Sequence, residues 1–341
     1  MNNKILVTGG CGYIGSVLVP ILLERGYEVR VFDKLYFGEE PLKGILDKID
    51  LVPGDVRNFS EDILDGVDGV VHLGSLSNDP TAAFYPRTNY TINYEGTVRL
   101  AEACKKRGIN RLTFASGCVV YGFYIESVAD ESSPTNPQGD YDKSKLDAEL
   151  TLQGMADKDF CPVILRQGTV FGPSPRMRWD LVLNAFVMRA CDRGRCDVWY
   201  KGEAYRPLVH IRDVAEAHIR CLEAKPDKVR GQVFHVAHKN FRILELAHRV
   251  RATLAELGIK VEVDVNYDGV DKRSYQVSNQ KLSAVLGFTP EITVEQGVKE
   301  IVEAIQSGQY RDFAHPIHYN LPWMELLVAV EERLKKTGEV L

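Results

Sequence analysis

The sequence predicts an α/β fold with a doubly wound parallel sheet and a smaller C-terminal lobe. Strand-like apolar segments alternate with helical periodicity through the first half of the chain, as expected for strands joined by crossover helices. The first strand leads directly into a glycine-rich turn and a helix. With 341 residues the chain can also bury a large core, as one large domain or as two unequal lobes.

The first turn carries glycines at a spacing of three. Ile5 to Val7 is an apolar run suited to a buried strand, and Ile14 to Arg25 has helical apolar spacing that ends at Gly26. A tight turn, close approach of a pyrophosphate and close helix–strand packing each need a residue without Cβ, and the helix N-terminus offers N–H groups to the anion. An ordinary tight turn is the alternative to a dinucleotide site. The residues expected at the dinucleotide are Gly9, Gly12, Tyr13, Ile14 and Gly15.

The second strand supports a dinucleotide site. Glu28 to Phe32 alternates in hydrophobicity and is followed by Asp33, close to the distance expected for an acid that binds the ribose hydroxyls of the adenosine. A carboxylate at this position would repel a 2′-phosphate, which favours NAD over NADP. Lys34 beside it leaves NADP open.

The remaining elements continue the alternation. We expect strands ending at 51–52 and spanning 69–73, 111–115 and 162–165, and helices over 92–107, 141–154 and 180–193. The proline-rich loop 172–175 marks the passage into the smaller lobe. The chain therefore divides into residues 1–172, 173–315 and 316–341, with segments of the middle part returning to the sheet.

The last of these parts is expected to be a helix. Pro322 stands at a helix-start position and is followed by apolar residues at helical spacing. This face should pack against the body of the protein or against a second subunit. Its residues are Trp323, Leu326, Leu327, Val330 and Leu334.

Composition and charge restrict the class of partner. A net charge of −5, with 45% hydrophobic and 26% charged residues, is ordinary for a soluble globular protein and gives no basic field for nucleic acid. The sequence has no apolar run of membrane-spanning length and no signal peptide, so we expect a cytoplasmic protein without a membrane partner. The seven cysteines and the histidines lack metal-ligand spacing, which predicts reduced thiols and no metal site.

Several short motifs follow one another in a characteristic order. They are Thr8-Gly9-Gly10-Cys11-Gly12-Tyr13-Ile14-Gly15-Ser16, Gly54-Asp55-Val56-Arg57, Val71-His72-Leu73-Gly74, Asn93-Tyr94-Glu95-Gly96-Thr97, Val120-Tyr121-Gly122 and Tyr141 with Lys145. To about Gly308 the chain resembles the extended short-chain dehydrogenase/reductases, and most closely their NAD-dependent nucleotide-sugar epimerase/dehydratase branch. The resemblance implies a Rossmann-type NAD-binding domain and a substrate-binding C-terminal lobe. It also implies that Asp55 and Val56 lie at the adenine and that the loop from Leu73 to Ser75 borders the cofactor.

Tyr141 and Lys145 are the candidates for the chemistry. At a spacing of four they share one helix face, one turn apart. A phenol with a pKa of about 10 is a poor base at neutral pH, but a nearby ammonium and a positive nicotinamide favour the phenolate, so Tyr141 is the expected general acid/base. The resemblance implies that Lys145 also holds the nicotinamide ribose. A partly buried tyrosine beside a solvated lysine is the alternative for the pair in isolation.

The third member of the family's catalytic set is missing from its usual position. Relatives carry Ser or Thr four residues before Tyr121, where this chain has Gly117. Ser116 is one residue early, and strand alternation would point it to the opposite side. Either a local bend brings Ser116 round, or its role passes to Cys118, a water or the substrate; Cys118 could equally be a small hydrophobic residue at a strand end. The Asp-Glu pair of 4,6-dehydratases is replaced by Cys118 and Val119, which disfavours dehydration.

The C-terminal half offers candidates for substrate binding. Arg206 begins a segment that resembles the family element in which an arginine meets a nucleotide phosphate, and Arg273 is the second choice. A guanidinium suits this contact because its planar fork can bond two phosphate oxygens. A surface ion pair is the alternative for each. Asn184 falls where relatives touch the diphosphate.

We therefore predict an enzyme that binds NAD tightly and epimerises a nucleotide-activated sugar, with C4 as the favoured carbon. Tyr141 would take a hydroxyl proton while hydride passes to the nicotinamide, and the ketosugar would turn over before hydride returns to its opposite face. A nucleotide-sugar 4-dehydrogenase or ketoreductase, a decarboxylase and a dehydratase remain alternatives, as does a non-catalytic NAD-binding sensor. The resemblance also implies a homodimer formed through the helices at 92–107 and 141–154.

Overall fold

The computed structural model describes residues 3–123, 127–271 and 273–339, and its centre is a seven-stranded sheet in the order β10-β6-β5-β4-β1-β2-β3. Every strand pair in it is parallel. The order runs outward from β1 in both directions, which confirms the predicted doubly wound fold. The strands are β1 (Lys4–Thr8), β2 (Glu28–Asp33), β3 (Asp50–Pro53), β4 (Gly69–His72), β5 (Arg111–Gly117), β6 (Cys161–Gln167) and β10 (Val233–Val236).

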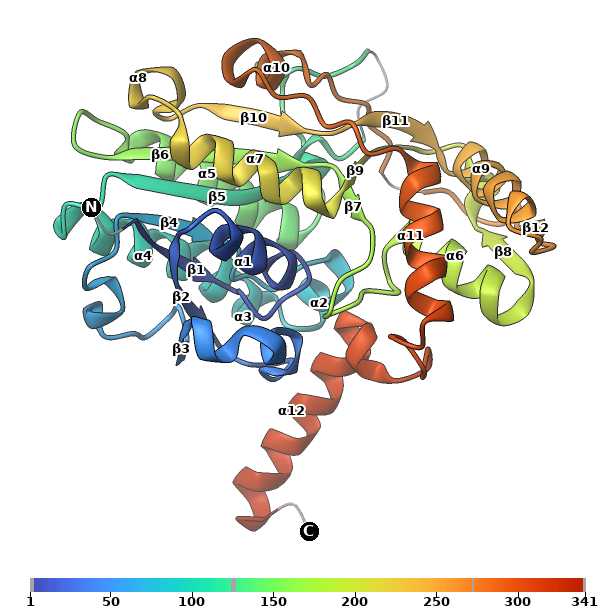
Figure 1. Ribbon diagram of the computed structural model, residues 1–341, viewed down its shortest axis with the longest axis horizontal. Coiled ribbons are helices and arrows are strands. Elements are labelled where there is room, and N and C mark those ends of the chain that lie inside the picture. Colours follow the sequence, from blue (N-terminus) through green and yellow to red (C-terminus); the bar gives the residue numbers. More distant parts are fainter. Residues whose placement is uncertain (1–2, 124–126, 272, 340–341) are drawn as a thin grey trace.

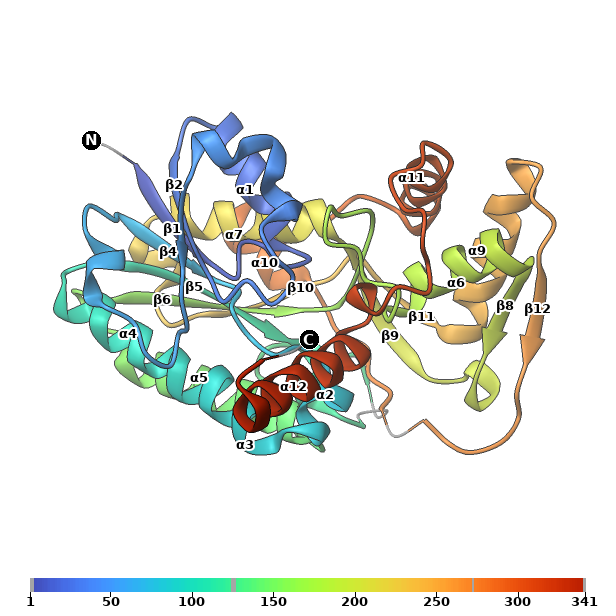
Figure 2. The same ribbon diagram turned by 90° about the horizontal axis from the view of Figure 1, so that it is seen from below.

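Helices cover both faces of this sheet. Figure 2 shows α1 (Gly15–Glu24) and α7 (Ile211–Glu223) on one face, and α4 (Gly96–Lys106) and α5 (Asp140–Met155) on the other. The sheet strands are buried on both sides, as the near-continuous burial of β4 and β6 shows. The carboxyl ends of the strands therefore form the open edge where a ligand can bind.

The expected helix over 92–107 is present, but its first turn is a π-helical turn. Two short helices, α2 (Asp79–Phe84) and α3 (Pro86–Tyr90), lead into a π-helical turn at Thr91–Glu95 before α4 begins. The wider turn directs Asn93 toward the loop after β4. There its side chain accepts a hydrogen bond from the Leu76 amide at 2.8 Å and donates one to the Leu76 carbonyl at 2.9 Å. Periodicity alone did not reveal this departure.

The smaller lobe is interleaved with the large sheet, because α7 and β10 return to the sheet between its segments (Figure 1). It contains a three-stranded sheet in the order β11-β9-β7 and a two-stranded sheet of β12 and β8. Its strands are β7 (Thr169–Phe171), β8 (Arg195–Val198), β9 (Tyr205–His210), β11 (Lys239–Arg242) and β12 (Glu262–Val265). Its helices are α6 (Val182–Arg193), α9 (Ile243–Glu256) and α11 (Val294–Gln306). The short helices α8 (Pro226–Val229) and α10 (Gln280–Leu286) contact the strands β6 and β10 of the large sheet. Short 3₁₀ helices lie at Glu40–Lys48, Glu61–Leu64, Cys118–Tyr121, Tyr200–Gly202 and Pro316–His318.

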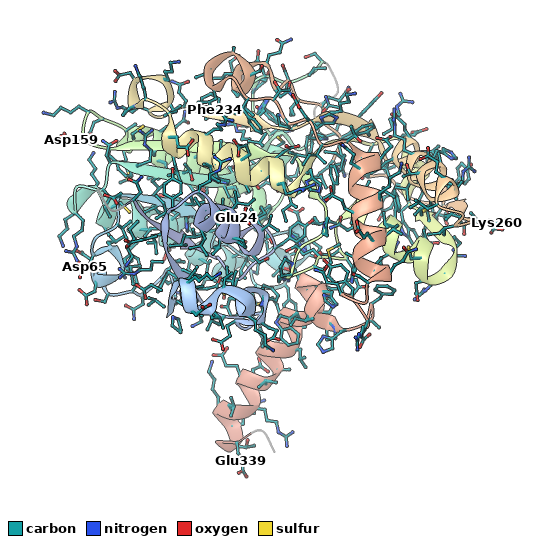
Figure 3. All side chains as sticks on the ribbon, viewed as in Figure 1. Glu24, Asp65, Asp159, Phe234, Lys260 and Glu339 are labelled. Atoms are coloured by element: carbon teal, nitrogen blue, oxygen red, sulfur yellow. The ribbon has the colours of Figure 1, made fainter. Side chains whose placement is uncertain are left out.

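The C-terminal helix α12 (Asn320–Thr337) packs mainly through its first half, where Leu327 also contacts the core. Its first turns contact α2, and Met324 is buried there. The predicted apolar face is only partly covered, since Leu326 and Leu334 are 45% and 42% exposed. The far half of α12 projects from the body, with Glu339 just beyond its end (Figures 1 and 3).

Two further properties hold for the described part of the chain. No helix there is long and apolar enough to cross a membrane. All seven cysteines are free thiols.

Candidate active site

A cavity of about 660 Å³ lies at the carboxyl ends of the sheet strands. It extends from the glycine turn after β1 to the smaller lobe. The structure brings all the predicted cofactor-binding residues to its wall, namely Gly9, Gly12, Tyr13, Ile14, Gly15, Asp33, Asp55, Val56, Leu73, Ser75, Tyr141 and Lys145. Positions spread over 137 residues of sequence, from 9 to 145, thus converge on one surface.

The glycine turn has the shape required for a dinucleotide. Gly9 has a φ of +72°, and a Cβ on Gly15 would lie 2.3 Å from the Gly9 carbonyl oxygen and 2.5 Å from Gly10 Cα. Side chains at these positions would therefore force strand and helix apart. With glycine in place, the N-terminus of α1 opens onto the cavity and can receive a phosphate.

Asp33 is held rigidly at the end of β2. Its carboxylate accepts hydrogen bonds from the Cys11 amide at 2.9 Å and the Leu35 amide at 2.7 Å. Burial raises the pKa of Asp33, while these two backbone bonds oppose that rise. Lys34, which left NADP open, forms an ion pair with Asp55 at 3.3 Å. The geometry fits an acceptor for ribose hydroxyls.

We expect Asp33→Ala to weaken NAD binding about 10- to 100-fold, because hydrogen bonds to a charged group contribute about 1.5–3 kcal/mol. Asp33→Asn should lose less NAD affinity and should gain affinity for NADP, since it removes the repulsion of the 2′-phosphate. Titration calorimetry with both dinucleotides measures this, with the exposed Asp47→Ala as control. Unchanged NAD affinity in Asp33→Ala would remove the ribose assignment.

Tyr141 and Lys145 project from α5 onto the cavity wall. The Lys145 Nζ donates to the Ala115 carbonyl at 2.8 Å and lies 4.7 Å from the centroid of the Phe114 ring and 5.9 Å from that of Tyr141. Burial lowers the pKa of Lys145 to about 7. Burial and the Asp79 carboxylate raise the pKa of Tyr141, and Arg178 opposes them. Added positive charge near the phenol would therefore favour the phenolate that acts as a base.

Ser116 does not reach Tyr141 through a local bend. Strand alternation is kept, as the sequence predicted for that position: Ser116 borders the cavity, but its buried hydroxyl donates to the Glu149 carboxylate. Gly117 lies on the cavity wall, and a Cβ there would meet nothing closer than Val119 Cγ1 at 3.4 Å. The cavity thus has room for the family hydroxyl, which this chain does not supply at that position.

The candidate Cys118 is not brought into the cavity. The 3₁₀ turn that follows β5 directs its thiol inward, where it donates to the Arg166 carbonyl at 3.1 Å. The side chain is fully buried beside Tyr121 and Tyr275, and burial raises the pKa of its thiol. Cys118 as a substitute proton donor is therefore wrong, because a buried thiol bonded to backbone cannot meet a substrate.

We expect Cys118→Ala to keep its turnover within about twofold of the unchanged enzyme, with a loss of stability of about 1 kcal/mol from the cavity it leaves. Initial rates and thermal unfolding check the two effects separately. A loss of turnover in a variant that is folded and saturated with NAD would return Cys118 to the catalytic set.

Asn184 is likewise absent from the cavity wall. Its amide donates to the Tyr13 hydroxyl and to the Arg178 carbonyl, each at 3.0 Å, and accepts from the Gly172 amide at 3.2 Å. The side chain is fully buried. The prediction that Asn184 touches the diphosphate is wrong here, because its hydrogen-bonding groups are used to join α6 to the proline-rich loop and to Tyr13.

Arg206 and Arg273 both lie on the cavity wall and contact each other, since Arg206 donates to the Arg273 carbonyl. Each also has an acidic partner. Arg206 pairs with Asp271 at 2.7 Å, and Arg273 pairs with Asp79 across the two lobes. Both arginines are placed where they can bind an anion, but each already pairs with a carboxylate. A phosphate would therefore have to compete with these carboxylates.

The sequence analysis assigned no role to three charged residues that the structure places on the wall. Arg178 lies near the Tyr141 phenol and forms a two-point ion pair with Asp180 at 2.9 Å. Arg176 is buried nearby, and Asp79 faces Tyr141 from the start of α2. The sequence offered one signal for these residues, namely that Arg176 and Arg178 directly follow the proline-rich loop. Within the described ranges, no group of three or more His, Cys, Asp or Glu residues could hold a metal ion.

Comparison with known proteins identifies the family. A model of the NAD dependent epimerase/dehydratase family matches residues 5–237. A UDP-glucose 4-epimerase of Corynebacterium glutamicum is 27% identical over 321 residues, covering 89% of this chain and 96% of that protein. A dTDP-glucose 4,6-dehydratase of Streptomyces niveus is 27% identical over 355 aligned residues, covering 98% and 99%.

Solved structures agree with these relatives. MoeE5 in complex with UDP-glucose and NAD is 25% identical and superposes with a TM-score of 0.77 over 90% of this chain and 100% of that chain. The NAD complex of UDP-glucose 4-epimerase from Thermus thermophilus is 26% identical, with a TM-score of 0.75 over 89% and 99%. Because the family model matches well over half of the chain, this protein belongs to the NAD-dependent epimerase/dehydratase family of enzymes.

Proposed function

We propose that the protein epimerises a nucleotide-activated sugar, with the ring C4 as the reacting carbon. The observation that carries this proposal is the Tyr141–Lys145 pair on the cavity wall, next to a strand end that offers no carboxylate where dehydratases carry their acid pair. There Cys118 points inward and Val119 lies on the wall. The similarity to UDP-glucose 4-epimerases supports the same reaction.

The residues of the chain perform the proton transfer and the orientation. NAD, when bound, supplies the reversible acceptance of hydride from the ring carbon. Tyr141 takes the proton of the C4 hydroxyl and returns it after the ketosugar has turned over. Lys145, anchored on the Ala115 carbonyl, stabilises the phenolate through its ammonium. Arg206 and Arg273 bind the nucleotide phosphates, which replace the carboxylates of Asp271 and Asp79 as partners of the two guanidinium groups.

A 4,6-dehydratase is the second candidate, because acidic groups lie close to Tyr141 on a different element. Asp79 is on the cavity wall, and burial together with Asp79 raises the pKa of Asp142 to about 7. Asp79 is therefore the candidate on the cavity wall for the acid that a departing hydroxyl needs. The 27% identity to a dTDP-glucose 4,6-dehydratase supports this candidate equally.

We also propose that the protein is a homodimer in the cytoplasm. Exposed apolar side chains lie on the side of α2, α3 and α5, where Phe84, Tyr90 and Leu150 are 42%, 39% and 59% exposed. Burial of such a face in a second copy would remove this apolar area from water. The free thiols fit a reducing compartment. Light scattering coupled to size-exclusion chromatography measures the oligomeric state.

Incubation with UDP-, GDP-, CDP- and dTDP-sugars, without added cofactor, tests the reaction. Mass spectrometry and NMR should show an isomer of unchanged mass, with only transient absorbance near 340 nm. Loss of water would establish the dehydratase, and loss of carbon dioxide a decarboxylase. A stoichiometric demand for added cofactor would indicate a dehydrogenase or ketoreductase, and binding without any product would support the sensor.

A further inference from the structure

Arg176 is a buried cation on the cavity wall that forms no ion pair with any residue the structure describes. It is 4% exposed, its guanidinium lies 3.6 Å from the centroid of the Phe37 ring, and its Nη2 donates to the Asn320 side chain at 2.5 Å. Its Nε is buried and has no hydrogen-bond partner among the described residues. The other buried arginines differ, since Arg166, Arg178 and Arg206 each have a carboxylate partner.

A buried charge without an ion-pair partner is unfavourable, and the pKa of Arg176 reflects this. Burial and the neighbouring Arg178 lower the pKa of Arg176 to about 9, and the carboxylate of Asp180, which pairs with Arg178, opposes them only in part. A cation in this state is stabilised by an anion that enters the cavity. The Nη hydrogens that Asn320 does not use give such an anion a charge-assisted contact.

The position of Arg176 indicates which anion this is. Two residues earlier, Ser174 contacts the first turn of α1: its hydroxyl lies 2.9 Å from the Ser16 hydroxyl and 2.8 Å from the Tyr13 carbonyl. On the other side, Phe37 follows Asp33 by four residues. Arg176 thus stands between the glycine turn and the segment after the ribose-binding acid. When a dinucleotide is bound, its pyrophosphate lies at the glycine turn and helix N-terminus, next to the ribose that the acid binds.

The substrate diphosphate is a poorer match for this residue. The arginines expected to bind it, Arg206 and Arg273, have Asp271, Asp79 and Tyr205 as partners. None of these residues contacts Arg176. The cavity therefore has two separate groups of arginines, one toward the smaller lobe and one beside α1.

The first turn of α12 holds Arg176 in place. Asn320 accepts from Arg176 and donates to the Ser77 carbonyl at 2.9 Å and hydroxyl at 2.8 Å, in the loop after β4. Trp323 donates to the Tyr36 carbonyl at 2.6 Å, in the loop after β2, and Met324 lies on the cavity wall. In Figure 2, α12 lies across the side of the molecule that carries α2 and α3. Helix α12 thus connects the C-terminal part of the chain to the loops after β2 and β4, on the cofactor side of the cavity.

We propose that Arg176 binds the pyrophosphate of the dinucleotide, and that α12 is a strap which positions Arg176 and retains the cofactor. This inference rests on NAD binding by the family member and on the placement of Asp33, and not on which sugar is transformed. Its test therefore uses no sugar, so that an error in the proposed reaction leaves the result unaffected.

Calorimetry on the full chain, freed of bound nucleotide, separates the pyrophosphate from the rest of the ligand. ADP-ribose contains the pyrophosphate, and adenosine does not. We expect Arg176→Gln to bind ADP-ribose about 10- to 100-fold more weakly and adenosine within about twofold of the unchanged protein, since only the charged contact is lost. Arg176→Lys keeps the charge without the planar fork, so its affinity for ADP-ribose should lie between those of Arg176→Gln and the unchanged protein. Arg333→Gln, an exposed arginine on α12, is the matched control and should bind both ligands normally.

Asn320 tests the strap. Asn320→Ala should weaken ADP-ribose binding about 3- to 10-fold and release NADH faster in stopped-flow fluorescence, because Arg176 loses its tether. Asn320→Asp should weaken ADP-ribose binding further, since its carboxylate competes for the guanidinium. Normal binding in both Asn320 variants would refute the strap. An equal loss for ADP-ribose and adenosine in Arg176→Gln, or no loss for either, would refute the phosphate contact, and the ligand-free unfolding temperature shows whether each variant is folded.

Discussion

Tyr141→Phe should lower kcat by about 10²- to 10⁴-fold, the range typical for loss of a general acid/base, while NAD affinity changes by no more than a few fold. The phenol oxygen is the only group that this substitution removes, and the ring keeps its place beside Lys145. Single-turnover formation of NADH should slow by the same factor, because proton removal and oxidation of the sugar occur together. Both quantities are measured on protein saturated with substrate.

Tyr94→Phe provides the matched control for this experiment. The Tyr94 hydroxyl accepts a long hydrogen bond of 3.4 Å from Thr151, and the residue does not line the cavity. We expect this variant to turn over normally. If Tyr141→Phe also retained normal turnover, the assigned base would be wrong, and a second group on the wall, such as Asp79, would have to move the proton.

Glu149→Ala should lower the free energy of unfolding by about 3–5 kcal/mol, the loss expected when one partner of a buried ion pair is removed. Glu149 is fully buried, and the Arg166 side chain is 6% exposed. The Arg166 Nε lies 3.0 Å and its Nη2 2.7 Å from Glu149 Oε2, and Ser116 donates to the same carboxylate. Although burial opposes it, Glu149 holds the pKa of Arg166 above its ordinary value. The variant would leave this guanidinium charged and unpaired.

Urea unfolding at pH 7 measures the loss. Glu245→Ala is the control, because Glu245 pairs with Arg249 at 3.0 Å on the surface and both side chains are nearly half exposed. A surface pair of this kind contributes about 0–1 kcal/mol. A similar small change in Glu149→Ala would show that the Arg166 guanidinium finds another partner or water when the carboxylate is lost.

The elements near the N-terminus were predictable from the sequence because their signals are local. β2 ends at Asp33 and α1 ends just before Gly26, as alternation and the C-terminal glycine indicated. Tyr141 and Lys145 share the cavity wall because a spacing of four on a helix requires it. The direction of Ser116 also followed from the alternation of a strand.

The errors arose where a side chain is satisfied by residues far away in the sequence. The Cys118 thiol bonds to a carbonyl 48 positions later, and the Asn184 amide bonds to Tyr13, 171 positions earlier. The sequence also left open whether the body or a second subunit covers the apolar face of α12, because helical spacing shows that such a face exists but not what covers it.

The sequence by itself therefore determined the doubly wound sheet, the dinucleotide turn with its acid, and the Tyr141–Lys145 pair. Each of these follows from backbone geometry over a few residues, and a family pattern ties them together. Only the tertiary structure decided that Cys118 and Asn184 lie away from the cavity wall, and that Arg176 lies on it without a carboxylate partner among the described residues. The physical reason is that burial and charge pairing depend on which distant segments meet, and Arg176 meets Asn320 across 144 positions of sequence.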